Sequence, residues 1–262
     1  MTDLETDLSR LSVVWTGDAD RPEDVMDLRP DDLVADLPVD QLERMRQAGG
    51  ELVDVYRVLA KTGDNIVGLL LAGHETFYEW NHYPDGDCYD PETHSQYYYH
   101  AHRGALGEHG HFHTFLRAKG MSGQPTPLPF ERAESWPKGS EAVAHLVAIS
   151  MDRFGVPTHL FTTNRWVTGE TLYGAEDVIA MLERFEMDLI HPSWAVNRWM
   201  SALVALFRPQ IEQLLHKRDA VLAARLGAAE GDPLEDRDLE ITSIIAIDAD
   251  TQIAAVEKAL AR

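Results

Sequence analysis

The chain has 262 residues, 44% of them hydrophobic, and a formal net charge of −21. That length can bury a sizeable core, as one large domain or two small ones. Such acidity argues against nucleic acid and anionic membranes as partners, because both are also negatively charged, and we expect a folded protein whose partner is a small-molecule substrate or ligand.

The cysteine content and the lengths of the apolar runs indicate the cellular compartment of the protein. A single cysteine, Cys88, excludes an intramolecular disulfide and fits a reducing compartment. The acidic first residues lack the basic segment and apolar run of a signal peptide. No apolar run reaches the ~18 residues of a membrane-spanning helix. We therefore expect a cytoplasmic protein.

The first strong periodic pattern lies between Asp40 and Leu59. Its apolar residues recur at helical spacing and predict a helix, with Asp40 and Glu43 as a capping box. Residues 65–72 predict a second, short helix. Residues 73–92 are aromatic, polar and rich in turn formers, so we expect a loop there.

Histidines then crowd into one stretch. Six of the twelve histidines lie within residues 94–113. Residues 95–103 are rich in aromatic side chains and residues 109–116 alternate, so both predict strands. The link at 104–108 is short and contains two glycines, which favours an antiparallel hairpin.

Strand alternation gathers most of these histidines on one face of the hairpin. Centring the turn on residues 106–107 pairs His102 with His111 and His100 with His113, whereas a slip of two residues would keep the same faces. The side chains expected on this face are Tyr98, His100, His102, His109, His111, His113 and Phe115.

Convergent imidazoles are typical of a transition-metal site. We predict one ion, iron or zinc, held by His100, His102, His111 and His113. Three of these ligands would leave an open position, whereas four would make a closed or redox site. Metal-free hydrogen-bonded imidazoles and a surface hairpin that collects metal only in vitro remain the alternatives. Further candidate ligands are His94, His109, His145 and His159.

The segment after the hairpin predicts more of the same sheet. Residues 120–138 carry four prolines and are expected to be an extended connection that covers one side of the site. Residues 141–152 and 157–164 predict two further strands. Alternation places His145 on the same face as Val147.

A polar and aromatic cluster follows the last of these strands. Arg165 can clamp a carboxylate or phosphate in bidentate fashion, Trp166 can form a pocket wall, and Asn164 lies beside them. We predict that these three residues bind substrate. An ordinary turn with a surface salt bridge is the equally weighted alternative.

The rest of the chain is mostly helical in pattern. Apolar stripes predict helices at 176–187, at 193–207 with Ser193 as the cap, and at 211–222. Residues 239–247 predict a strand or short helix. Asp250 is expected to cap a final helix that runs through Leu260.

These elements predict an α+β fold. A small antiparallel sheet of four or five strands carries the histidine hairpin. Helices from both ends of the chain cover one face, and the loops at 74–92 and 120–138 partly close the site on the other. The expected division is an acidic, loosely ordered arm at 1–36 and a single domain at 37–262, which contains the hairpin at 94–117 and a helical part at 175–262.

Two resemblances accompany this interpretation. The phrases SQYYYHAHR and EHGHFHTF, with TNRWVTGET downstream, resemble an uncharacterised bacterial family, one of the domains of unknown function, which implies no activity and no assigned ligand. The HxH pairs also resemble the cupin superfamily in their site chemistry. The interval after His102 is longer than in the cupin motif, and the second HxH pair is too close.

We therefore predict a metal-dependent enzyme that acts on a small molecule. Tyr98 or Glu108 would be the acid/base group or would support a ligand, and Arg165 would position an anionic substrate. Non-haem iron redox chemistry and zinc hydrolysis both fit, and the tyrosines favour redox chemistry. The alternative is a non-catalytic metal- or ligand-binding protein.

Overall fold

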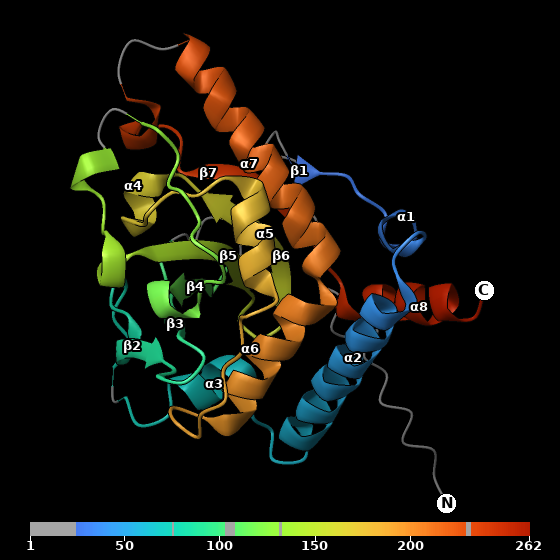
Figure 1. Cartoon of the computed structure of the whole chain (residues 1–262). Coiled ribbons are helices and arrows are strands. Elements are labelled where there is room, and N and C mark those ends of the chain that lie inside the picture. Colours follow the sequence, from blue (N-terminus) through green and yellow to red (C-terminus); the bar gives the residue numbers. More distant parts are fainter. Residues whose placement is uncertain (1–24, 75, 103–107, 131–132, 229–231) are drawn as a thin grey trace, which may run out of the picture.

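The protein combines one large sheet with a layer of helices (Figure 1). The computed structural model describes residues 25–74, 76–102, 108–130, 133–228 and 232–262. Within them, seven strands lie in the order β1-β7-β6-β5-β4-β3-β2. The α+β class is confirmed, and the sheet is larger than the four or five strands predicted.

The sheet is mixed. β1 runs parallel to β7, and the other neighbouring strands are antiparallel. The described strands are β1 (Val25–Met26), β2 (Tyr83–Tyr89), β3 (Ser95–His100), β4 (Gly110–Arg117), β5 (Val143–Met151), β6 (Pro157–Thr163) and β7 (Ile241–Ala246).

The helices gather mainly on one side of this sheet, where α5, α6 and α7 pass in front of the strands in Figure 1. The described helices are α1 (Pro30–Val34), α2 (Val39–Ala60), α3 (Ile66–Leu70), α4 (Arg165–Thr168), α5 (Ala175–Leu182), α6 (Trp194–Leu206), α7 (Arg208–Ala228) and α8 (Ala249–Leu260). Short 3₁₀ turns are η3 (Ala118–Gly120), η4 (Ala133–Ser135), η5 (Gly139–Glu141) and η6 (Pro233–Glu235).

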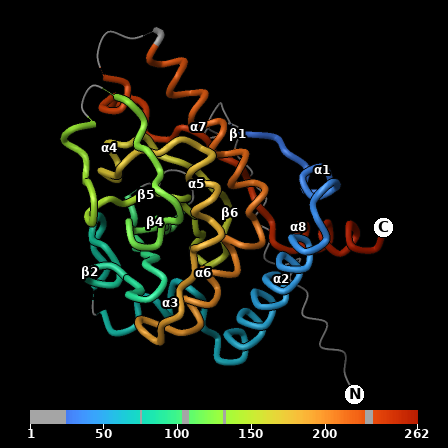
Figure 2. Tube along the Cα trace, in the orientation of Figure 1, coloured from blue at the N-terminus to red at the C-terminus, as the bar shows by residue number. Residues whose placement is uncertain are grey.

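Helices from both ends of the chain form this layer, as predicted. In Figure 2 the N-terminal α2 runs beside α6, and the two helices pack against each other. Phe112 on β4 points into this layer, with its ring centroid 5.6 Å from that of Trp199 on α6. Because side chains alternate along a strand, His111 and His113 on either side of Phe112 point to the opposite face.

Helix positions are mostly as predicted, but the predicted side-chain caps are not. Ser193 does lie at the N-cap of α6, yet its side chain makes no capping hydrogen bond. α2 begins after Pro38 without a side-chain cap, so the predicted capping box at Asp40 is wrong. Asp40 instead accepts a hydrogen bond from Arg44 one turn later, at 2.9 Å. α8 is capped by Asp248, not by Asp250. In the part of the chain that the structure describes, no helix is both long and apolar enough to cross a membrane.

The loop predicted at 73–92 contains strand β2. This strand contains a proline and a glycine, which are rare in central strands, and the sequence pattern therefore predicted a loop. β2 is an edge strand with a break in its pairing, since Tyr83 pairs with Tyr99 but Cys88 pairs with Tyr97. Of the predicted N-terminal arm, residues 1–24 lie outside the described residues, and the remainder includes β1 and α1.

Candidate metal centre

Strands β3 and β4 form the predicted histidine face with a different register. His100 pairs with His111, and Tyr98 pairs with His113. The predicted pairing of His100 with His113 is therefore wrong by two residues. A two-residue slip preserves the face of every side chain, so the imidazoles still meet. The predicted turn at 106–107 lies outside the described residues.

Three of these histidines converge. Among the described residues, His100, His111 and His113 each offer a ring nitrogen, and these atoms all lie within 4.8 Å of one another. The Nε2 atoms of His100 and His111 are 2.8 Å apart. All three side chains are buried. Buried imidazole nitrogens this close form a donor set that fits one transition-metal ion.

Glu108 orients one member of the group. Its Oε1 lies 2.5 Å from Nδ1 of His111, and its Oε2 accepts a hydrogen bond of 2.6 Å from Ser150. Glu108 precedes β4, which begins at Gly110, so strand alternation does not fix the direction of its side chain. A carboxylate on Nδ1 directs Nε2 of His111 toward the centre, as outer-shell carboxylates commonly do for metal-binding histidines.

A β-bulge brings His145 to this face. Thr114 pairs with Val147 and Phe115 pairs with His145, so Leu146 is an extra residue in β5. An extra residue reverses the faces of the side chains on either side of it. The prediction that His145 shares a face with Val147 is therefore wrong.

His145 supports His113 from behind. Its Nε2 lies 3.0 Å from Nδ1 of His113. Burial, together with the positive charge of Arg218, lowers the pKa of His145 to about 3, so its ring is neutral at pH 7. The backbone N–H of His145 donates to Oε2 of Glu170 at 2.7 Å. Burial raises the pKa of Glu170 to about 7, against the opposing effects of Arg218 and this hydrogen bond.

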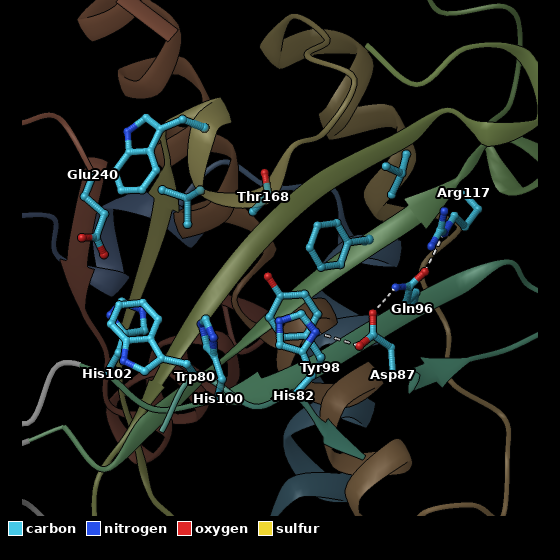
Figure 3. A pocket seen from close by; sticks show the side chains of 14 residues that line it. Trp80, His82, Asp87, Gln96, Tyr98, His100, His102, Arg117, Thr168 and Glu240 are labelled. Atoms are coloured by element: carbon cyan, nitrogen blue, oxygen red, sulfur yellow. Dashed lines mark hydrogen bonds and ion pairs between the residues drawn. The ribbon is translucent and has the colours of Figure 1, made fainter. Parts of the chain in front are cut away.

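A cavity of about 440 Å³ adjoins the group, and its walls include His100, His102 and Tyr98 (Figure 3). The His102 ring stacks on Trp80 at a centroid distance of 4.4 Å and lies 5.0 Å from the ring of His111. His102 therefore stands beside the three-histidine group, and its role as a fourth ligand stays a prediction. Burial raises the pKa of the Tyr98 phenol well above its usual value, so that phenol stays protonated.

Of the three residues predicted to bind substrate, one lines the cavity and two do not. Trp166 lines the cavity, with its indole N–H bonded to the carbonyl of Leu239. Arg165 instead pairs with Glu235 at 3.2 Å and lies over the ring of Trp136. Asn164 is fully buried and caps the short helix α4. Substrate binding by these residues stays a prediction.

Other histidines lie apart from the group. His109 precedes β4, and its Nδ1 lies 2.6 Å from the hydroxyl of Tyr99, whose ring faces the helix layer. The prediction that His109 shares the face of His111 is therefore wrong. His94 bonds the Tyr89 hydroxyl, and Nδ1 of His159 lies 3.1 Å from the Thr158 hydroxyl.

Sequence reasoning missed several residues at this site. Trp80, Asp87 and Arg117 line the cavity, yet the first two lie in a segment predicted to be loop, and Arg117 ends an apolar strand. Nothing in their local pattern distinguishes them from surface residues. Similarly, Ser150 on β5, which donates a hydrogen bond to Glu108, was not singled out.

A known protein family matches most of the chain. A family model described as Domain of unknown function (DUF6969) matches residues 46–247, a span that contains β3, β4, β5 and α4. This match confirms the resemblance to a domain of unknown function that the sequence motifs indicated. No curated protein and no solved structure matches the chain.

Proposed function

The chain belongs to the DUF6969 family, and we propose that it is a metal-dependent enzyme that acts on a small molecule at His100, His111 and His113. The observation that carries this proposal is the convergence of three buried imidazoles within 4.8 Å. Desolvating three polar rings on one sheet face is unfavourable unless they gain partners, and an ion would supply a partner common to all three.

The surroundings suit such an ion. Imidazole ligands favour zinc, iron, copper or nickel. Two nitrogen ligands that each lie ~2.05 Å from a tetrahedral ion are about 3.4 Å apart. The Nε2 atoms of His100 and His111, now 2.8 Å apart, would therefore separate slightly on binding an ion. Any pair of ligand nitrogens near the 4.8 Å limit of the group would move closer together. Outer partners are in place, because Glu108 holds His111 and His145 holds His113.

The adjoining cavity favours an enzyme over a closed binding site. Three protein ligands leave a coordination position for a reactant, and His100 lies in the cavity wall. A bound ion would supply Lewis-acid or redox chemistry there. Because its raised pKa keeps the phenol of Tyr98 protonated, this hydroxyl can donate a hydrogen bond to a reactant in the same cavity. Iron and zinc both fit three histidines.

Elemental analysis tests the proposal. Protein purified without a histidine tag should contain about one equivalent of iron or zinc, or take it up from Fe(II) or Zn(II). The double variant His100→Ala/His113→Ala should lose the metal, whereas His94→Ala, which alters a histidine outside the group, should keep it. Circular dichroism checks that each variant is folded.

The outcomes separate the competing interpretations. Iron would direct assays to oxidation and zinc to hydrolysis. A metal whose site takes up no further ligand would support a non-catalytic binding protein. A folded wild-type protein that binds neither iron nor zinc would overturn the proposal and leave a hydrogen-bonded imidazole cluster.

A further inference from the structure

The cavity beside the histidines has a distinct chemical composition. It lies between the sheet face and helix α4, with a volume of about 440 Å³. That volume falls within the usual range for small-molecule sites. The residues that line the cavity indicate which ligand it accepts. That this ligand is also a substrate rests on the proposed metal centre.

Flat rings form much of the wall. The ring of Tyr98 lies parallel to that of His82, at a centroid distance of 3.7 Å and an angle of 7°. Phe115 lies next to Tyr98, with centroids 5.5 Å apart. Trp80 and Trp166 add two indoles. Walls of this kind favour a planar ligand, because aromatic faces stack on planar groups.

One positive side chain enters this aromatic wall. Arg117 is the sole lysine or arginine among the lining residues that the structure describes. Its Nε donates to Gln96 Oε1 at 2.6 Å, and Gln96 Nε2 donates to Asp87 Oδ2 at 2.6 Å. The other oxygen of Asp87 lies 3.0 Å from Nδ1 of His82. This chain of contacts fixes the guanidinium through Nε and leaves its terminal nitrogens for a carboxylate fork.

Arg117 differs in this respect from Arg165. Within the described residues, Arg117 has no carboxylate within ion-pair distance, whereas Arg165 pairs with Glu235 and bonds the carbonyl of Glu170. Anion binding in so acidic a protein needs a positive group that is not already neutralised by a neighbour. Of these two arginines, Arg117 meets that requirement.

The cavity also has two ends. Figure 3 shows Arg117 on one side of Tyr98, and His100 and His102 on the other. We propose that this cavity binds a planar aromatic carboxylate, with the carboxylate on Arg117, the ring along the aromatic wall that includes Phe115 and the two indoles, and the far edge of the ring toward His100. The substrate class of the proposed metal centre is then a small aromatic acid.

Fragment binding tests this assignment. Benzoate, benzamide and cyclohexanecarboxylate are titrated into metal-free protein, with binding followed by NMR chemical shifts. Benzoate should bind at least about tenfold more tightly than benzamide, because only benzoate carries the charge, and several-fold more tightly than the non-planar cyclohexanecarboxylate. Equal affinity for benzoate and benzamide would overturn the proposal.

Variants locate the anion. Arg117→Met should remove the preference for benzoate over benzamide, and Arg117→Lys should restore part of it, because lysine keeps the charge without the planar fork. Arg153→Met, at an exposed arginine on the β5–β6 turn, should leave it unchanged. Loss of the preference in Arg165→Met, with Arg117→Met behaving as wild type, would overturn the assignment.

Repeating the benzoate titration with zinc-loaded protein tests the Arg117 site and the metal centre separately. Benzoate that binds only with zinc present, and equally well in Arg117→Met, would be a ligand of the ion, so the Arg117 proposal would fail while the metal centre stood. Arg117-dependent benzoate binding in a protein that takes up no metal would support the carboxylate site and overturn the proposed function alone.

Discussion

The Nε2 atoms of His100 and His111 lie 2.8 Å apart, at hydrogen-bond distance. In such a pair one imidazole donates the proton and the other accepts it. An ion placed between them takes the lone pairs of both, so the shared proton must leave the Nε2 atoms, either for Nδ1 of the same ring or for solvent. A protonated imidazolium has no free lone pair, so protons compete with the ion for these rings. Affinity for metal should therefore rise with pH through the range in which imidazoles lose protons, which metal titrations from pH 5.5 to 8 would check.

Replacing Glu108 with glutamine should weaken metal binding. The substituted amide keeps the length of the side chain but lacks the negative charge that makes His111 a stronger ligand. Changes of this kind typically lower metal affinity about 10- to 100-fold. Competition with a chelator of known affinity measures the effect, and Glu134→Gln on the exposed turn η4 is the matched control. Equal affinities in Glu108→Gln and wild type would show that the carboxylate does not tune the site.

Two glycines should respond oppositely to alanine. A Cβ on Gly110 would lie 2.5 Å from the hydroxyl oxygen of Tyr99 and 2.6 Å from the carbonyl oxygen of His100, so Gly110→Ala should lower the free energy of unfolding by about 1–3 kcal/mol. A Cβ on Gly50 meets nothing within 4 Å, so Gly50→Ala in α2 should raise it by about 0.5–1 kcal/mol. Urea denaturation of both variants measures the difference.

Glu170 should make stability depend on pH. Its folded pKa is about 7, against a usual value of 4.5, so the folded state holds the proton more tightly than the unfolded state. Its contribution is therefore fully present below pH 4.5 and is lost as pH rises through 7. The shift corresponds to about 3 kcal/mol.

Glu170→Gln isolates this contribution, because glutamine resembles the protonated carboxyl and does not titrate. Relative to wild type, the variant should gain stability between pH 5 and pH 8. Urea unfolding of both proteins in EDTA gives the comparison. A constant difference across this range would mean that Glu170 is ionised in the folded protein throughout.

Cys88 should be unreactive in the folded protein. Its side chain is buried, and burial raises the pKa of the thiol from 9.0 to about 11. That rise alone lowers the thiolate fraction about a hundredfold. Labelling with a thiol reagent at pH 8 should be slow in buffer and fast in urea. Rapid labelling in buffer would reveal frequent opening of β2, the edge strand that carries Cys88.

Local patterns in the sequence predicted the histidine face but not its register. Alternation along β3 and β4 is a local property, so the shared face of His100, His111 and His113 followed from it. The pairing did not, because the link at 104–108 permits several turns and a slip of two residues preserves every face.

Other differences from the sequence predictions come from long-range structure. The bulge that turns His145 toward His113 arises from pairing between β4 and β5, which no local pattern records. Likewise, the pairing of Arg165 with Glu235, 70 residues away, could not be predicted from the sequence, and the binding of an anionic substrate by Arg165 stays a prediction. Arg117 offered no comparable signal, since only the folded sheet places it beside the aromatic cavity.

All three converging histidines come from a single hairpin, and His100 and His111 are 11 residues apart in sequence. Closing so short a loop has a small entropic cost even in a denatured chain. The unfolded protein should therefore retain part of its affinity for the ion, and ligand linkage then predicts that metal raises the melting temperature less than its affinity for the folded protein would suggest. Because these ligands are so close in sequence, the ion could also bring β3 and β4 together before the rest of the sheet has formed.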